Sequence, residues 1–196
     1  MATVNLATSG LITAAGALAD GALFSQSASV SRDGRWPMFI SLYKGKGLLI
    51  SWMQFDPTGN LAGNAFWVKL ASIDRFNSEG FTNRVVVSGS AYTPPAPGTR
   101  VLNLTNAAVT LAEGNLAAPL VAAAVLSNNN QFTLSGTNGI KLTLLSASGL
   151  VNGTFIHPQT RLTTAIKAVV LQNNNTIQGF FLGTNQSGRF EAVASQ

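Results

Sequence analysis

The stretch Val4-Asn5-Leu6-Ala7-Thr8-Ser9-Gly10-Leu11-Ile12 alternates apolar and polar residues, turns at Ser9-Gly10 and begins a second apolar run. The stretch Leu142-Thr143-Leu144-Leu145, followed by Ser148-Gly149-Leu150-Val151, repeats this plan later in the chain. Alternation with a period of two predicts strands, and a glycine between two such runs predicts a turn. We therefore expect an antiparallel β protein with two internally similar halves.

Further hairpin signals recur between these two stretches and after them. Arg32-Asp33-Gly34-Arg35 separates two alternating runs, and Asp-Gly in that position is a strong hairpin signal. Asp56-Pro57-Thr58-Gly59-Asn60 and Thr137-Asn138-Gly139 are also typical of turns. Residues 106–126 are rich in alanine, but glycine and proline interrupt them, so they predict two short strands rather than a helix.

Short connections between consecutive strands predict an all-β, up-and-down antiparallel barrel. We expect about ten or more strands, in a closed barrel or in a flattened, sandwich-like one. Residues 92–98 contain three prolines and a glycine, a composition typical of a stiff, extended connector. We expect one domain over residues 1–196, with halves 1–91 and 99–196 joined by this connector. A domain boundary at the connector is the alternative.

The composition limits the partners and the chemistry of the protein. Only 10% of the 196 residues are charged, and the net charge of +5 comes from scattered cations, which is not the dense basic stripe of a nucleic-acid-binding protein. The absence of cysteine excludes disulfides and thiolate metal sites. No apolar run approaches the length of a membrane helix, and no basic-then-apolar leader is visible. We expect neither nucleic-acid binding nor a membrane span.

Two longer motifs carry a resemblance to a known kind of domain. One is Arg32-Asp33-Gly34-Arg35-Trp36-Pro37 with Leu42-Tyr43-Lys44-Gly45-Lys46-Gly47, and the other is residues 179–189, Gly-Phe-Phe-Leu-Gly-Thr-Asn-Gln-Ser-Gly-Arg. They resemble uncharacterised β domains that form C-terminal modules of large surface or secreted proteins of Verrucomicrobia-like bacteria. The resemblance covers most of the chain and implies an extracellular or cell-surface location, as part of a larger protein or cleaved from one. It implies no catalytic residues, and a cytoplasmic location is the alternative.

The ionisable residues offer little for catalysis. His157 is the only histidine, and its place before Pro158 in a turn predicts an exposed side chain. A catalytic triad or a two-histidine metal site would need residues that the chain lacks. Asp74 and Glu79 are the only acids close together in an irregular segment. These observations favour a non-catalytic protein, with a small hydrolase, with or without calcium, as the alternative.

The turn at residues 56–60 is the candidate for a metal site. Asp56, Thr58 and Asn60 place oxygen atoms at alternate positions, which is a spacing that calcium loops use. Calcium takes six to eight oxygen ligands, whereas this turn offers one carboxylate. Calcium is therefore the one cofactor that the sequence suggests, and an ordinary turn is the alternative.

The aromatic residues give the main functional hypothesis. All three tryptophans, Trp36, Trp52 and Trp67, lie in the first half of the chain together with Tyr43. Strand alternation places Trp36 with Met38 on one face of their strand and Phe39 on the other, and it places Trp52 with Ile50. Flat rings beside polar side chains bind sugars or apolar small molecules, and the same rings also fill protein cores.

We therefore expect a binding surface that Trp36, Tyr43, Trp52 and Trp67 form and that Arg35 and Lys44 border. The expected partner is a small molecule, a glycan or a neighbouring protein domain. The corresponding function is that of an extracytoplasmic binding or interaction module. A purely structural spacer domain is the remaining alternative.

Overall fold

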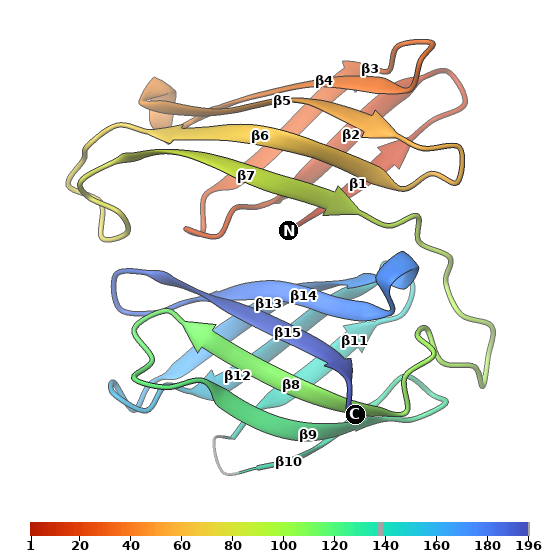
Figure 1. Cartoon of the computed structure of the whole chain (residues 1–196), viewed down its shortest axis with the longest axis vertical. Helices are drawn as coiled ribbons and strands as arrows, with labels where there is room; N and C mark the ends of the chain where they lie inside the picture. The colour runs from red at the N-terminus through yellow and green to blue at the C-terminus, as the bar shows by residue number, and fades with distance from the viewer. Residues whose placement is uncertain (137–138, 196) are drawn as a thin grey trace. The chain divides into compact units, whose positions relative to one another are not determined.

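The regular secondary structure of the protein consists almost entirely of antiparallel strands, which confirms the predicted all-β class. The computed structural model describes residues 1–136 and 139–195. Two short 3-10 turns occur among them, η1 (Tyr43–Gly45) and η2 (Gln172–Asn174), and neither helical turn has the length or apolar character of a membrane span. The strands gather into two compact units, Ala2–Ala91 and Tyr92–Gln196, with Met1 grouped with the second (Figure 1). Each unit has its own hydrophobic core.

The N-terminal unit contains two antiparallel sheets, and in each of them neighbours in the chain are neighbours in space. The first sheet has the order β1-β2-β3 and the second the order β4-β5-β6-β7. Short turns make most of these connections, whereas the longer loop of residues 70–80 joins β6 to β7. Between the two sheets, Gly34 of the predicted Asp-Gly turn has the positive φ of 73° that such a turn requires. The strands are β1 (Ala2–Leu6), β2 (Leu11–Ala17), β3 (Leu23–Ser29), β4 (Arg35–Leu42), β5 (Gly47–Phe55), β6 (Leu61–Lys69) and β7 (Phe81–Gly89).

Alternation divides the strands of this unit between a buried and an exposed face. In β4 every second side chain is buried and every other one is exposed. The buried side chains of β4 pack in one core with Ile12 from β2 and Met53 from β5. They are Trp36, Met38, Ile40 and Leu42.

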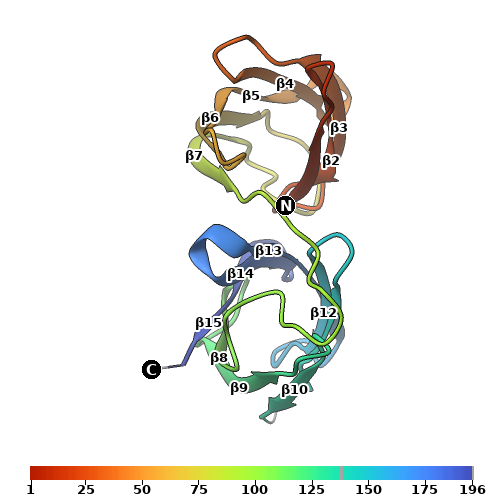
Figure 2. The same ribbon diagram turned by 90° about the vertical axis from the view of Figure 1, so that its right-hand side faces the viewer.

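The C-terminal unit is an eight-stranded antiparallel sheet that nearly closes into a barrel (Figure 2). Its strand order is β10-β9-β8-β15-β14-β13-β12-β11, so the two end strands, β10 and β11, are consecutive in the chain and contact each other. The strands are β8 (Asn106–Glu113), β9 (Leu120–Leu126), β10 (Phe132–Ser135), β11 (Lys141–Leu145), β12 (Leu150–Ile156), β13 (Thr163–Leu171), β14 (Thr176–Leu182) and β15 (Ser187–Ala194).

The chain that follows the proline-rich segment enters this barrel (Figure 2). Val101, Leu102 and Leu104 are buried in the same core as Phe155 and Phe181. These residues precede the first strand of the barrel and still contribute to its core. The interior is therefore packed with apolar side chains that come from the strands and from this entering segment.

Two amide side chains hold the entering segment in place. The Oε1 atom of Gln172 accepts the N–H of Thr93 at 2.8 Å, and its Nε2 atom donates to the carbonyl oxygens of Thr93 and Val101 at 3.0 and 3.2 Å. Asn130 accepts the N–H of Val101 at 2.7 Å and donates to the carbonyl of Thr99 at 2.8 Å. The predicted connector is thus fixed to the C-terminal unit by hydrogen bonds to its backbone.

The motif of residues 179–189 forms β14, a tight turn and β15. A Cβ atom at Gly179 would lie 2.1 Å from the carbonyl oxygen of Lys167, so only glycine fits at this point between β13 and β14. In the turn, the Oδ1 atom of Asn115 accepts the backbone N–H groups of residues 184–186 at 2.9 to 3.3 Å. The residues of this motif therefore serve close packing and turn formation.

The predicted strands agree with the observed ones, including the two short strands in residues 106–126. A single barrel of ten or more strands and two similar halves are not confirmed, because the structure has an eight-stranded near-barrel and two smaller sheets. The single domain with halves 1–91 and 99–196 stays a prediction; residues 92–98 group with the C-terminal unit. The turn predicted at residues 137–139 lies mostly outside the described residues.

The expectation that His157 is exposed is wrong. Its side chain is 1% exposed, and its ring lies 5.9 Å from that of Phe155. The Nε2 atom donates to the carbonyl oxygen of Gly114 at 3.1 Å. The turn after His157 directs the backbone outward, whereas the imidazole points into the core.

Replacing Gly179 by alanine tests the contact between β13 and β14. The added methyl group overlaps a backbone oxygen that cannot rotate away, so we expect the C-terminal unit to lose about 1–3 kcal/mol of stability. Unfolding in urea, followed by far-UV circular dichroism, measures the loss. Gln178→Ala, at the exposed neighbouring position of β14, is the control and should change stability by about 0.5 kcal/mol or less. Equal stability of the two variants would contradict the packing argument.

Candidate functional site

The outer face of the four-stranded sheet in the N-terminal unit carries an unusual concentration of apolar side chains. Phe39 on β4 lies directly opposite Ile50 on β5, and Ile50 lies opposite Phe66 on β6. In the neighbouring row, Pro37 lies opposite Trp52. Cross-strand partners on one face have their Cβ atoms about 5 Å apart, so these side chains are in reach of one another. We call six residues the apolar platform: Pro37, Phe39, Ile50, Trp52, Phe66 and Val86.

All members of the apolar platform are exposed. The exposed fractions are 68% for Trp52, 55% for Phe39, 52% for Phe66 and 83% for Val86. An antiparallel sheet with one face on a core ordinarily presents polar residues on its other face. Soluble proteins seldom leave a contiguous apolar area exposed unless it contacts a partner or a ligand. The apolar platform is therefore the strongest candidate for a binding surface.

Polar groups surround the apolar platform. Arg84 on β7 lies opposite Phe66, and Asn64 on β6 lies opposite Val86. Arg35 begins β4 and lies opposite Gln54, whose side chain donates to the carbonyl oxygen of Asp33 at 2.7 Å. Apolar rings with a few polar groups at the margin form the arrangement in which proteins bind small molecules and sugars.

The structure brings two of the six predicted ligand-binding residues, Trp52 and Arg35, to this outer face. Trp36 is 2% exposed and packs in the core. Tyr43 and Trp67 are half-buried against the same core. Lys44 is exposed in η1, which connects β4 to β5, and its backbone has a positive φ of 59°.

Tyr43 and Trp67 belong to a polar cluster at one end of the unit. The hydroxyl group of Tyr43 donates to Oδ2 of Asp20, and it accepts the indole N–H of Trp67 at 2.9 Å. Burial, together with the hydrogen bond to Asp20, raises the pKa of Tyr43, so the hydroxyl stays protonated as a donor. Asp20 itself is buried. The two rings therefore connect the β2–β3 turn to β6.

Lys69 extends this cluster to the loop of residues 70–80. Its side chain is buried, its Nζ atom donates to the carbonyl oxygen of Phe76, and it pairs with Asp74 at 3.3 Å. The same atom lies 5.0 Å from the centre of the Tyr43 ring. A buried ammonium group needs such partners, because leaving it unpaired would be costly. The cluster thus fixes the loop rather than presenting reactive groups to solvent.

The three predicted calcium ligands, Asp56, Thr58 and Asn60, lie close together, but they form hydrogen bonds with one another. The Oδ1 atom of Asp56 accepts from the N–H and hydroxyl of Thr58, at 2.8 and 2.6 Å, and from the N–H of Asn60 at 2.9 Å. The side chain of Asn60 donates to Oδ2 of Asp56 at 3.2 Å. The hydroxyl of Thr58, followed by the groups of Asn60, holds the pKa of Asp56 below its ordinary value. Calcium at this turn stays a prediction, and an ion there would compete with these hydrogen bonds.

The acids considered for catalysis are engaged elsewhere. Asp74 accepts from the hydroxyl of Ser72 at 2.8 Å and pairs with Lys69, and both interactions lower its pKa. Glu79 is exposed in the same loop. Across residues 1–136 and 139–195, no three His, Cys, Asp or Glu side chains lie close enough together to hold a metal ion.

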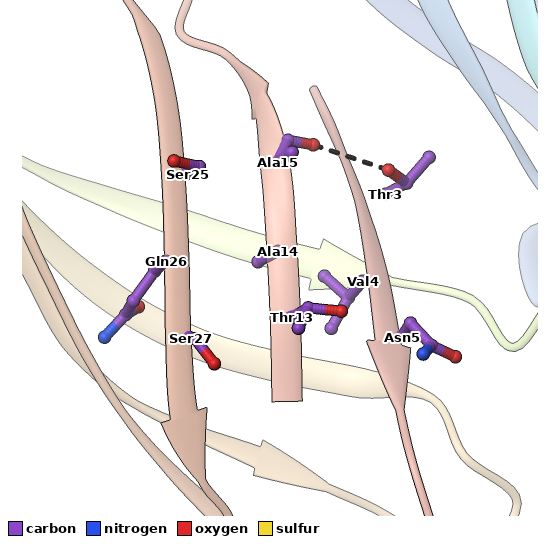
Figure 3. A pocket seen from close by; sticks show the side chains of 9 residues that line it. All are labelled: Thr3, Val4, Asn5, Thr13, Ala14, Ala15, Ser25, Gln26 and Ser27. Atoms are coloured by element: carbon purple, nitrogen blue, oxygen red, sulfur yellow. Dashed lines mark hydrogen bonds between the residues drawn. The ribbon is translucent and has the colours of Figure 1, made fainter. Parts of the chain in front are cut away.

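A wide, open depression lies over the sheet β1-β2-β3 (Figure 3). Small neutral side chains line it, with Thr3 on β1, Thr13 on β2 and Ser25 on β3 as examples. The hydroxyl of Thr3 donates to the carbonyl oxygen of Ala15 at 3.5 Å, a long and weak contact. With no charged side chain and no aromatic ring in its lining, this depression offers little affinity for a ligand.

Sequence reasoning did not assign Pro37, Phe39, Ile50, Phe66 and Val86 to a site. A signal for part of this set is present: residues 48–53, Leu-Leu-Ile-Ser-Trp-Met, are apolar at positions of both parities. A strand with one face on a core and one in solvent should alternate instead. The placement of Phe66 and Val86 beside this strand depends on the sheet register.

Comparisons with known proteins give no further assignment. No protein-family model matches the chain. No curated protein and no solved structure matches it either. The candidate site is therefore argued from its geometry.

The hydroxyl of Tyr43 is a further point to test. Tyr43→Phe removes the donor to the buried carboxylate of Asp20 and the acceptor of the Trp67 indole, so we expect a loss of about 1–3 kcal/mol from the N-terminal unit. All three tryptophans lie in this unit, so urea unfolding followed by tryptophan fluorescence reports on it selectively. Tyr92→Phe, which removes a hydroxyl from the C-terminal unit, should leave the tryptophan transition unchanged. A Tyr43→Phe transition at the wild-type midpoint would show that the cluster is not stabilising.

Acid should weaken the N-terminal unit through Asp56 and Asp74. The pKa of each is lowered in the folded protein, so their contribution is present above the unfolded-state pKa of about 3.9 and is lost as the pH falls through the lower folded-state value. The tryptophan-detected urea midpoint should therefore decrease from pH 5 to pH 2.5. Asp56→Asn should make this decrease smaller. A decrease of the same size in the variant would exclude Asp56 as a contributor.

Proposed function

We propose that this chain is a non-catalytic binding module and that the apolar platform is its ligand surface. The observation that carries the proposal is the exposure of Trp52, Phe39 and Phe66 side by side on the outer face of a sheet whose inner face already packs on a core. These rings are not needed to fill the interior. Their exposure has an energetic cost of roughly 25 cal/mol per Å² of apolar surface, which a bound partner would offset.

A glycan or another ligand with a flat apolar face fits this surface best. The outward positions of a sheet lie in one gently twisted plane, so they offer an extended contact area rather than a deep pocket. The C–H face of a sugar ring packs on an aromatic ring, and its hydroxyl groups can bond to amides at the margin, such as that of Asn64. A neighbouring protein domain is the second candidate partner, because exposed aromatic residues are also common in interface cores.

We also propose that the two halves of the chain are similar in architecture. The carbonyl oxygen of Gly10 accepts the N–H of Val30 at 2.9 Å. The carbonyl oxygen of Gly149 accepts the N–H of Val170 at 2.8 Å in the same way. This local likeness supports the view that the two halves are variants of one hairpin plan. In that view the N-terminal half has acquired the apolar platform and the C-terminal half has kept a packing role.

The proposed function also bears on the cellular location of the protein and on the spacer and hydrolase alternatives. An extracellular or cell-surface location, as implied by the resemblance of the motifs, suits a module that binds glycans. A spacer domain would have no reason to expose Trp52 and its neighbours. A calcium-assisted hydrolase would need free carboxylates, whereas Asp56 and Asp74 accept hydrogen bonds from their own loops.

Substitution of the platform tests the function. Trp52→Ala should weaken binding to any retained glycan by about two- to twelvefold, because an aromatic contact contributes about 0.5–1.5 kcal/mol beyond area burial. Retention on a panel of immobilised neutral and acidic polysaccharides, with protein depletion from solution as the readout, measures the effect. The fold should remain intact, since Trp52 contributes little to the core.

Two valines provide the matched control. Val86→Ala removes an exposed side chain from the apolar platform, and Val121→Ala removes an exposed side chain from β9 in the C-terminal unit. Only the first should reduce retention. Unchanged retention of Trp52→Ala and of Val86→Ala, with a loss in Val121→Ala, would place the ligand elsewhere and refute the proposal.

A further inference from the structure

The charges on the outer face of β4–β7 have a single sign. Arg35 and Arg84 are the charged residues at the outward positions of these four strands, and both are exposed. The outward positions are the exposed or half-buried members of each alternating pattern: Arg35, Pro37, Phe39 and Ser41 on β4, Leu48, Ile50, Trp52 and Gln54 on β5, Ala62, Asn64, Phe66 and Val68 on β6, and Thr82, Arg84, Val86 and Ser88 on β7.

Neither arginine is neutralised within the described residues. The ion pair present there joins Lys69 and Asp74, which lie in the polar cluster. The acid nearest in sequence to Arg35 is Asp33, in the turn before β4, and the acid nearest to Arg84 is Glu79, in the loop before β7. Asp56 lies in the turn that follows β5. The carboxylate of Asp56 is already occupied by its own loop. The two guanidinium groups are therefore available to a ligand.

The positions of the arginines indicate the size of that ligand. Arg84 lies in the same cross-strand row as Phe39, Ile50 and Phe66, on the strand at the far end of the sheet from β4. Arg35 lies on β4, four residues before Phe39. With strands about 4.8 Å apart and about 3.3 Å per residue, the two Cα atoms are separated by about 20 Å along a diagonal. The diagonal crosses the apolar platform, so one small molecule cannot reach both ends.

The chemistry between the arginines indicates rings with apolar faces. A ligand on the diagonal would pass over aromatic rings and over aliphatic side chains such as Ile50 and Pro37. Sugar rings present C–H faces that pack on both kinds of side chain, whereas nucleobases gain most by stacking on aromatic faces. Nucleic acids also bring one phosphate per nucleotide, which calls for a denser set of cations than two. Planar carboxylates suit guanidinium groups, which can bind them with two parallel hydrogen bonds.

We propose that the apolar platform binds an acidic polysaccharide, with uronic acid rings packed on Trp52, Phe39 and Phe66 and with carboxylates paired to Arg84 and Arg35. This inference rests on the proposed function and adds the class of ligand to it. Recognition then combines ring packing, which is indifferent to salt, with two ion pairs, which salt weakens. The charged groups select acidic chains over neutral chains of similar shape.

The test uses the full chain and electrophoresis in native gels that contain a dissolved polymer. The polymers are polygalacturonate as the uronate probe, a neutral galactan, dextran sulfate as a polyanion of different charged group, and single-stranded RNA. The variants are Arg84→Gln and Trp52→Ala. Arg189→Gln is the control, because Arg189 is exposed on β15 of the C-terminal unit and its replacement changes the net charge equally. Circular dichroism verifies that each variant is folded.

The wild type should be retarded most strongly by polygalacturonate, and less so as sodium chloride is added. Arg84→Gln should weaken that binding by about two- to fivefold, as expected for one exposed ion pair, and should leave any binding to the galactan unchanged. Arg189→Gln should behave as the wild type. Trp52→Ala should weaken binding to both polysaccharides.

Other outcomes separate the two proposals. If Trp52→Ala weakens binding to the galactan and Arg84→Gln has no effect on polygalacturonate, the apolar platform binds glycans but the acidic ligand is refuted. Equal retardation by dextran sulfate, or equal losses in Arg84→Gln and Arg189→Gln, would reduce the effect to net charge and refute it as well. Stronger binding of RNA would assign the surface to nucleic acid. If no variant alters any binding, the proposed function and this inference are both wrong.

Discussion

The alternation of side chains across a β-strand is the constraint on which this protein depends. A strand that packs on a core uses every second residue for that purpose, and the residues between them must face outward. In β4 the inward set of Trp36, Met38, Ile40 and Leu42 is fully apolar and buried. The outward residues of β4 do not contribute to the core. On β4, β5 and β6 these outward positions include the exposed rings of Phe39, Trp52 and Phe66, which the core does not require.

Strand alternation also explains what the sequence could predict. The separation of Trp36 from Phe39, and the sharing of a face by Ile50 and Trp52, follow from counting along one strand and are confirmed. The neighbourhood of Ile50 and Phe66 depends on which strands pair and in which register, and no local pattern contains that information. For the same reason the contact of Tyr43 with Asp20, which are 23 residues apart, could not be anticipated. The error about His157 has a related cause, since a turn signal describes the path of the backbone and not the direction of the ring.

The motif of residues 179–189 has a structural role. Gly179 is required by the closeness of β13 and β14, and residues 184–186 enclose the amide of Asn115. Such positions tolerate few substitutions, whatever the protein binds. Five of the six residues of the apolar platform lie outside the two motifs, and the exception is Pro37. The residues that serve packing and turn formation in residues 179–189 are therefore distinct from those of the apolar platform.

The burial of Val101, Leu102 and Leu104 makes the proline-rich segment part of the C-terminal unit rather than a free tether. A shortened chain that began at Asn106 would retain every strand of the near-barrel and still lack three of its core side chains. The side chains of Gln172 and Asn130 accept hydrogen bonds from the backbone N–H groups of Thr93 and Val101. A force applied to the chain at residue 91 would reach these hydrogen bonds before it reached any strand pair of the C-terminal unit. Residues 92–104 belong to no strand, so loss of these hydrogen bonds would free the segment without breaking any hydrogen bond between paired strands.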